Sequence, residues 1–216
     1  MRKIFLSLVT LFFVHSPLVF GDASSLTPDQ ALLKLKDGNK RFVEGKVLHP
    51  QQGTDRRTEL TKGQAPFATI LGCSDSRVPP EVVFDQGLGD LFIVRTAGNT
   101  FDNLALGSIE YSVAVLGSTL ILVLGHDQCG AVKATMEGKP LPGHIEDIAK
   151  RIAPGLKDRT CRIKDPLQCA IQANVEVIVA QLKDSSPILA PLVKAGKLKV
   201  VGGRYNLETG AVEMLP

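Results

Sequence analysis

The chain has 216 residues, and its 25 Lys and Arg against 22 Asp and Glu leave a formal net charge of +3. This near balance, with basic residues scattered along the chain, gives no indication of nucleic-acid binding. The length fits one domain that is able to bury a core.

The first residues have the pattern of a secretory signal peptide. Met1 to Lys3 is basic, and residues 4–20 are almost wholly apolar. Small residues suited to cleavage follow, so we expect residues 1–21 to be removed, with cleavage no later than residue 23. Residues 22–216 are then one domain in the periplasm or outside the cell, with no stable membrane anchor. The alternative is an uncleaved anchor, because about 17 apolar residues reach the lower limit for spanning a bilayer.

The remaining residues predict alternating helices and strands. Residues 26–45 predict an N-terminal helix, with Thr27 as N-cap and Pro28 at the first position. Four runs that are apolar throughout predict strands of a parallel sheet covered on both faces, at residues 65–72, 91–95, 119–125 and 197–201. Helical patterns fill residues 103–116, 131–137, 144–152 and 167–183, and residues 205–214 predict a hairpin. The predicted fold class is α/β, with a mainly parallel central sheet of about four strands, flanking helices and a C-terminal hairpin or edge strand.

Metal-binding residue types follow two of the predicted strands. Cys73 ends the first strand, and His126 ends the third. Cys129 opens the next helix. Because reactive groups in open α/β sheets gather beyond the carboxyl ends of the strands, we expect these side chains to meet. Two Cys and one His leave one position of a zinc ion open, which is typical of catalytic zinc sites.

Each motif taken alone has a simpler interpretation. A buried core cysteine close to a hydrogen-bonded histidine would explain Cys129 and His126 without a metal. Asp75 and Arg77, which follow Cys73 closely, would then form an ordinary surface ion pair. Their position beside a ligand instead indicates side chains that orient a molecule bound to the metal.

Four segments together resemble the β-class carbonic anhydrases. They are residues 73–81 (CSDSRVPPE), 87–99 (GLGDLFIVRTAGN), 107–111 (GSIEY) and 125–131 (GHDQCGA). The resemblance is to the plant-like branch, in an exported bacterial type, and covers nearly all of the chain after the signal segment. It implies the reversible hydration of carbon dioxide to bicarbonate and a proton by a zinc-bound hydroxide, with one zinc per subunit held by Cys73, His126 and Cys129.

The resemblance also implies roles for further residues. Asp75, fixed by Arg77, accepts the hydrogen bond of the hydroxide. The residues that match the substrate pocket are Gln64, Phe92, Tyr111 and Gly130. In the family the Gln and Phe are supplied by a partner subunit, which implies a homodimer or a tetramer. Without the resemblance, Phe92 and Tyr111 would be interpreted as core residues.

Two features of the chain bear on its regulation and stability. Relatives that are switched by bicarbonate use a pocket with a tryptophan, and this chain has none, so we expect Asp75 to leave the zinc open at neutral pH. Closure onto the metal at low pH is left undecided by the sequence. Cys161 and Cys169 form either a disulfide, which export would favour, or two free thiols.

Two other functions fit the same residues. The fold and ligand set also serve relatives that hydrolyse carbon disulfide or carbonyl sulfide, which differ mainly in access to the pocket. A periplasmic zinc-binding or redox protein without catalytic activity is the second alternative. The presence of Asp75, Arg77 and Gln64 argues against that second alternative.

Overall fold

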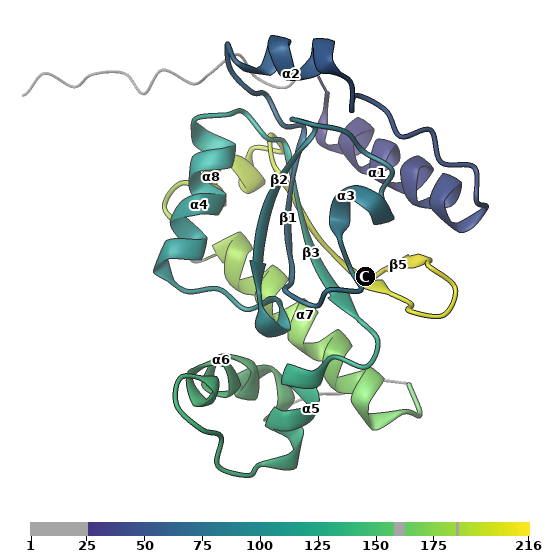
Figure 1. Ribbon diagram of the computed structural model, residues 1–216. Helices are drawn as coiled ribbons and strands as arrows, with labels where there is room; N and C mark the ends of the chain where they lie inside the picture. Colours follow the sequence, from purple (N-terminus) through teal and green to yellow (C-terminus); the bar gives the residue numbers. More distant parts are fainter. Residues whose placement is uncertain (1–25, 158–162, 185) are drawn as a thin grey trace, which may run out of the picture.

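The computed structural model describes residues 26–157, 163–184 and 186–216, and these form a five-stranded sheet with helices on both faces (Figure 1). The strands are β1 (Ala68–Cys73), β2 (Leu91–Thr96), β3 (Leu120–His126), β4 (Lys199–Tyr205) and β5 (Val212–Met214). Their order is β2-β1-β3-β4-β5. The first four pair in parallel, and β5 is antiparallel to β4. The α/β class, the parallel sheet and the C-terminal hairpin are therefore confirmed.

Strand β4 runs further than its apolar pattern predicts. The prediction ended at Val201 because Gly202 and Gly203 follow, and glycine is unfavourable in strands. The structure shows why a glycine is needed at the first of these positions. A Cβ on Gly202 would lie 2.8 Å from Cγ1 of Val175 in the helix packed across the sheet.

The main predicted helices are present. They are α1 (Pro28–Val43), α4 (Asn103–Ala114), α5 (Gly130–Glu137), α6 (Ile145–Lys157) and α7 (Pro166–Asp184). Helix α6 extends past its predicted end at residue 152 and includes Pro154. Three short helices, α2 (Thr54–Leu60), α3 (Pro80–Val83) and α8 (Leu189–Lys194), and a 3-10 turn, η1 (Ala97–Asn99), were not predicted. Such short segments carry too few apolar repeats to show a helical period, and α2 buries no residue at all.

Helix α1 begins as the sequence predicts. Thr27 and Gln30 form a reciprocal capping box, and Pro28 occupies the first turn. Such a cap contributes about 1 kcal/mol. The helix buries Ala31 and Leu35 against the sheet.

The core has three parts, which follow from the layers. Helices α4, α7 and α8 pack on one face of the sheet and contribute Ile109, Val175 and Leu189 to its core. Helices α1 and α3 cover the other face. A third cluster joins α5, α6 and α7 and includes Cys73 and Cys129. The two cysteines thus lie in a packed apolar region at one end of the sheet.

Several predictions fall on residues outside the described ranges. The signal segment, residues 1–21, is one of them, and Cys161, half of the disulfide pair, is another. These stay predictions. Across residues 26–216, apart from the two short gaps, no helix has the length and apolar character needed to cross a membrane.

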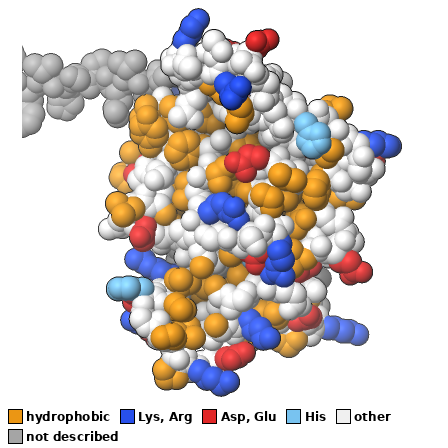
Figure 2. Space-filling view, viewed as in Figure 1, with side chains coloured by type: hydrophobic (Ala, Val, Ile, Leu, Met, Phe, Trp, Pro, Cys, Tyr) orange, Lys and Arg blue, Asp and Glu red, His pale blue; other side chains and the backbone are white. Residues whose placement is uncertain are grey.

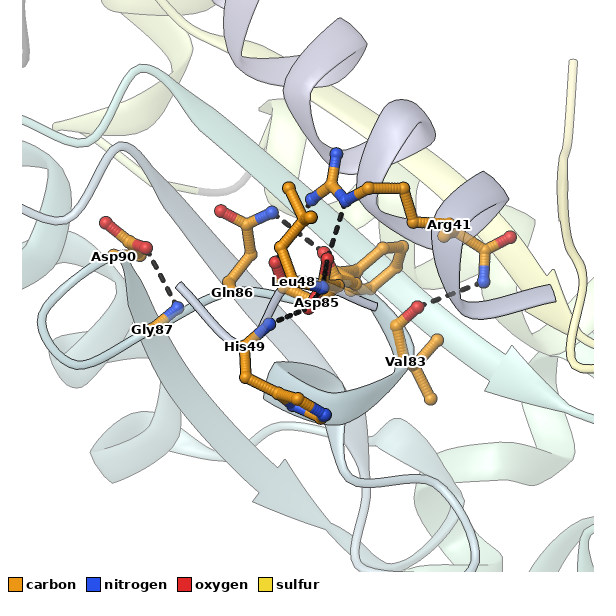
Figure 3. A network of polar contacts seen from close by, with 10 residues as sticks. Arg41, Leu48, His49, Val83, Asp85, Gln86, Gly87 and Asp90 are labelled. Carbon is orange, nitrogen blue, oxygen red and sulfur yellow. Dashed lines mark hydrogen bonds and ion pairs between the residues drawn. The ribbon is translucent and has the colours of Figure 1, made fainter. Parts of the chain in front are cut away.

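A buried carboxylate ties α1 to the segment that follows α3 (Figure 3). Asp85 accepts hydrogen bonds from Nε of Arg41 at 2.6 Å and from the backbone N–H groups of Leu48 and His49 at 3.0–3.2 Å. Its side chain is 1% exposed. Burial alone would raise the pKa of Asp85, but Arg41 and the two N–H groups outweigh it and lower the pKa. The ionised form is therefore the one that stabilises the fold.

We expect Asp85→Asn to lower the free energy of unfolding by about 3 kcal/mol, because it leaves Arg41 and a backbone donor without their charged acceptor. The difference in the free energy of unfolding between the two proteins should have its full size above the ordinary Asp pKa of about 3.9. It should shrink as the pH falls through the lower pKa of folded Asp85, because the wild-type side chain then becomes neutral too. Urea unfolding of both proteins between neutral and acid pH measures this. Asp147→Asn, at an exposed carboxylate, is the matched control and should change stability by less than about 0.5 kcal/mol. Equal effects of the two substitutions would contradict the prediction.

Candidate metal centre

Three ligand side chains meet at the carboxyl edge of the sheet. Strand β1 ends at Cys73 and the neighbouring parallel strand β3 ends at His126. Cys129 is the N-cap residue of α5. Gln128, with φ 54°, turns the backbone between His126 and Cys129. The two Sγ atoms and one imidazole nitrogen all lie within 4.8 Å of one another, and all three residues are buried.

The donor atoms fit a zinc ion. Ligands around tetrahedral zinc, with bonds of about 2.0–2.3 Å, lie within about 4 Å of one another. Nδ1 of His126 lies 2.8 Å from the carbonyl oxygen of Asp127 and donates to it. In the neutral imidazole the other nitrogen, Nε2, therefore carries a lone pair. It is fully buried and has no hydrogen-bond partner among the described residues, which is unfavourable unless a cation binds there.

The protonation of the cluster without a metal follows from its close contacts. The neighbouring thiol of Cys129 holds the pKa of Cys73 well below its usual range, despite burial. The same contact raises the pKa of Cys129, and burial raises it further. Burial lowers the pKa of His126, but the Cys73 thiolate more than offsets this. Metal binding must displace the remaining protons, so metal affinity falls as the pH falls.

The predicted Asp75 and Arg77 pair is formed beside the ligands. Oδ1 of Asp75 accepts from the backbone N–H and from Nε of Arg77 at 3.0 and 2.8 Å, and Oδ2 accepts from Nη2 at 2.7 Å. These bonds hold the pKa of Asp75 well below its usual range. Oδ2 is also 3.7 Å from Nε2 of His126. The carboxylate thus faces the position that a metal ion would occupy.

Arg95 holds the backbone of this segment. Its guanidinium donates to the carbonyl oxygens of Cys73 at 2.9 Å and of Asp75 at 2.6 Å. The N–H of Gly98 donates to Sγ of Cys73 at 3.3 Å. The sequence indicates that Arg95 acts near the site, through its charge or as an ion pair, but it predicts none of these three hydrogen bonds. A long-range backbone contact leaves no spacing signal in the sequence.

The predicted substrate residues are not all near the metal ligands. Gln64 precedes β1, at the end of the sheet opposite Cys73. Phe92 pairs with Thr69 rather than Cys73, so it lies about 13 Å away along the strands. Its ring packs on Tyr111 of α4, with centroids 6.4 Å apart. Within one chain, therefore, these three residues do not complete the site.

Gly130 directly follows a ligand and borders a cavity of about 300 Å³ between α5 and α6. The lining is almost entirely apolar and consists of Ala97, Gly130, Ala131, Ala134, Thr135, Leu141, Ile145, Ile148 and Ala149. Small side chains keep this space open. A small apolar molecule would fit next to the ligand loop.

Comparisons with known proteins agree with the site. The carbonic anhydrase family model matches residues 68–212. The carbonic anhydrase of Mycolicibacterium smegmatis is 49% identical, over 87% of this chain and 93% of its own. Carbonic anhydrase 2 of Mycobacterium tuberculosis is 44% identical, over 85% and 90%. A tetrameric β-carbonic anhydrase of Sordaria macrospora has a similar structure, with a TM-score of 0.67 and 26% identity over 74% of this chain and 85% of that one.

We expect the purified protein to hold one zinc ion per chain and Cys73→Ser to lose most of it, because serine is a much poorer zinc ligand than a thiolate. Elemental analysis after dialysis against a weak chelator measures the metal. Ser76→Ala, at an exposed position in the same segment, should keep the full zinc content. Stoichiometric zinc in the Cys73→Ser protein would show that the metal binds elsewhere.

Proposed function

This chain belongs to the β-class carbonic anhydrases, whose reaction is the reversible hydration of carbon dioxide, and we propose that a zinc ion held by Cys73, His126 and Cys129 serves that reaction here. The observation that carries the proposal is the cluster of three ligand atoms within 4.8 Å, with the ion-paired Asp75 at its edge. When bound, zinc lowers the pKa of a coordinated water to about 7 and so supplies a nucleophile near neutral pH.

The chain's own residues set the charge and orientation of the site. Two thiolates balance the charge of a divalent ion, and the hydrogen bond from Nδ1 of His126 to Asp127 keeps Nε2 directed at the metal position. Asp75 is ionised and can only accept hydrogen bonds. A fixed acceptor of this kind would accept a hydrogen bond from the O–H group of the nucleophile, which leaves a lone pair of that oxygen directed at the carbon of the substrate.

The ion pair with Arg77 supports a site that is open at neutral pH. Both oxygens of Asp75 are engaged by the guanidinium. Movement of the carboxylate onto the metal would break both bonds. The intact pair therefore favours the open arrangement, in line with the lack of tryptophan.

Carbon dioxide, rather than a sulfur analogue, is the favoured substrate. The relatives at 49% and 44% identity are both carbonic anhydrases. The apolar cavity beside Gly130 would also accept an uncharged, compact molecule of either kind, so the choice of substrate rests on these relatives.

The active unit is a homodimer or a larger assembly. Gln64 and Phe92 lie too far from Cys73 to act in the same chain, so a partner subunit would supply them. On α4 and at its C-cap, the side chains of Leu104, Tyr111 and Val115 are exposed by 81%, 48% and 41%, and their spacing puts them on one face. Strand β2 is an edge strand with partly exposed apolar residues, which natural monomers usually avoid. Figure 2 shows further hydrophobic side chains on the viewed surface.

The enzyme acts outside the cytoplasm, as an exported member of the plant-like branch. The support for export is the basic start and apolar run of residues 1–21. Mass spectrometry of the protein recovered from the periplasm should find an N-terminus between residues 22 and 24. An intact Met1 in an active, membrane-bound protein would instead indicate an uncleaved anchor.

We expect Asp75→Asn to lower kcat/KM for carbon dioxide hydration by about 10- to 100-fold without loss of zinc, because Asp75 orients the reaction rather than binding the metal. Stopped-flow hydration assays with parallel zinc analysis measure both quantities. Asp55→Asn, at an exposed carboxylate in α2, is the matched control and should leave activity unchanged. Faster turnover of carbonyl sulfide or carbon disulfide than of carbon dioxide would overturn the proposed substrate.

We expect complementation between two weakened subunits. His126→Ala removes a ligand, and Phe92→Ala removes part of the pocket wall, so each homodimer should be poorly active. The mixed dimer is obtained by co-expression with two affinity tags. If Phe92 acts across the interface, one of the two sites in this dimer has both residues intact, so the dimer should recover up to about half of the wild-type activity. A mixed dimer no more active than the average of its parents would place both residues in the same subunit's site.

A further inference from the structure

A buried side chain of α7 is linked to the metal ligand Cys73 through one residue. Nδ2 of Asn174 donates to the carbonyl oxygen of Gly98 at 2.9 Å. The N–H of the same glycine donates to Sγ of Cys73 at 3.3 Å. Asn174 is only 2% exposed. The two hydrogen bonds join helix α7, the turn η1 and the end of β1.

The position of Asn174 is unusual for a polar side chain. Its neighbours Ala173 and Val175 are buried in the same helix, and Val175 packs against the strand residues Gly125 and Gly202. A buried amide is unfavourable unless its hydrogen bonds are made. The carbonyl oxygen of Gly98 accepts a hydrogen bond from this amide. The two residues are 76 positions apart, so the bond joins separate layers of the fold.

The turn that receives this bond has little freedom. Gly98 and Asn99 have φ angles of 69° and 45°, a left-handed conformation that is unfavourable for most residues. A Cβ on Gly98 would lie 2.7 Å from Cδ1 of Ile152 and 3.2 Å from Cβ of Ala131. Helices α5 and α6 thus close around the turn, and Asn174 holds its carbonyl group from α7. The direction of the Gly98 N–H depends on this enclosure.

We propose that Asn174 is a positioning residue for the metal centre: it holds the Gly98 turn so that the backbone N–H points at the Cys73 thiolate. The inference rests on the proposed zinc site. N–H donors to a zinc-bound thiolate fix the direction of the sulfur and offset part of its charge. Removal of Asn174 therefore weakens metal binding although the residue touches neither the metal nor a ligand.

The test compares Asn174→Leu, which has nearly the same volume but no donor, with the parent chain and with Gln172→Leu. Gln172 is the matched control, because it bonds to Glu176 within α7 and not to the turn. Zinc affinity is measured by competition with a chelator in full-length, folded protein. We expect about 10-fold weaker binding for Asn174→Leu and no more than about 2-fold for Gln172→Leu. Asn174→Ser, a milder change that also cannot reach Gly98, should weaken binding if the leucine variant does not fold.

Nuclear magnetic resonance of the cadmium-substituted parent provides a second measurement that does not depend on the folding of a variant. If Gly98 donates to a metal-bound Cys73, its amide proton shows scalar coupling to the cadmium nucleus, and this coupling should shrink in Asn174→Ser. Absence of the coupling in the parent overturns the proposal, and so does unchanged zinc affinity in the Asn174 variants. In either case a parent that binds zinc and hydrates carbon dioxide leaves the proposed function standing. A parent that binds no zinc overturns both.

Discussion

The parallel pairing of β1 with β3 is the constraint on which the rest of the structure depends. Both strands are buried along their whole length, and their register brings Cys73 and His126 to the same edge of the sheet. A slip of one residue would turn the side chains of a strand to the opposite face. The apolar burial that stabilises the sheet therefore also decides whether the ligands meet.

The metal centre is energetically unfavourable without a bound ion, because it places several ionisable groups in a buried region. Desolvation opposes the charged forms of Cys73 and His126. The surrounding donors compensate in part: the N–H of Gly98 donates to the Cys73 thiolate, and Arg95 holds the carbonyl groups of Cys73 and Asp75. A divalent cation would neutralise the two thiolates and bind the imidazole nitrogen that has no hydrogen-bond partner among the described residues.

One chain brings the three candidate ligands together but leaves two of the predicted pocket residues far from them. The ligands and the Asp75 and Arg77 pair come together within a subunit. Gln64 and Phe92 lie toward the other end of the sheet. The same surface exposes apolar residues of α4 and an uncovered edge strand. In the proposed dimer, the partner chain would cover this surface and would supply Gln64 and Phe92 to the metal centre.

Much of the fold and site could be predicted from the sequence, because the signals are local. Strands buried on both faces are apolar throughout, a helix start is marked by Thr27 and Pro28, and ligands at strand ends are visible as Cys73 and His126. The resemblance to β-class carbonic anhydrases then supplied the reaction. Short helices such as α2 and α3 were missed because they carry too few residues to show a period.

By itself, then, the sequence determined the α/β class, the three ligands and the Asp75 and Arg77 pair. Only the tertiary structure decided which distant groups support them: Arg95 on the neighbouring strand, and Asn174, which reaches Gly98 from 76 residues away. It also decided that Phe92 lies far from Cys73 in its own chain. The physical reason is that hydrogen bonds between layers and strand register depend on how elements pack, and no local pattern of residues records that packing.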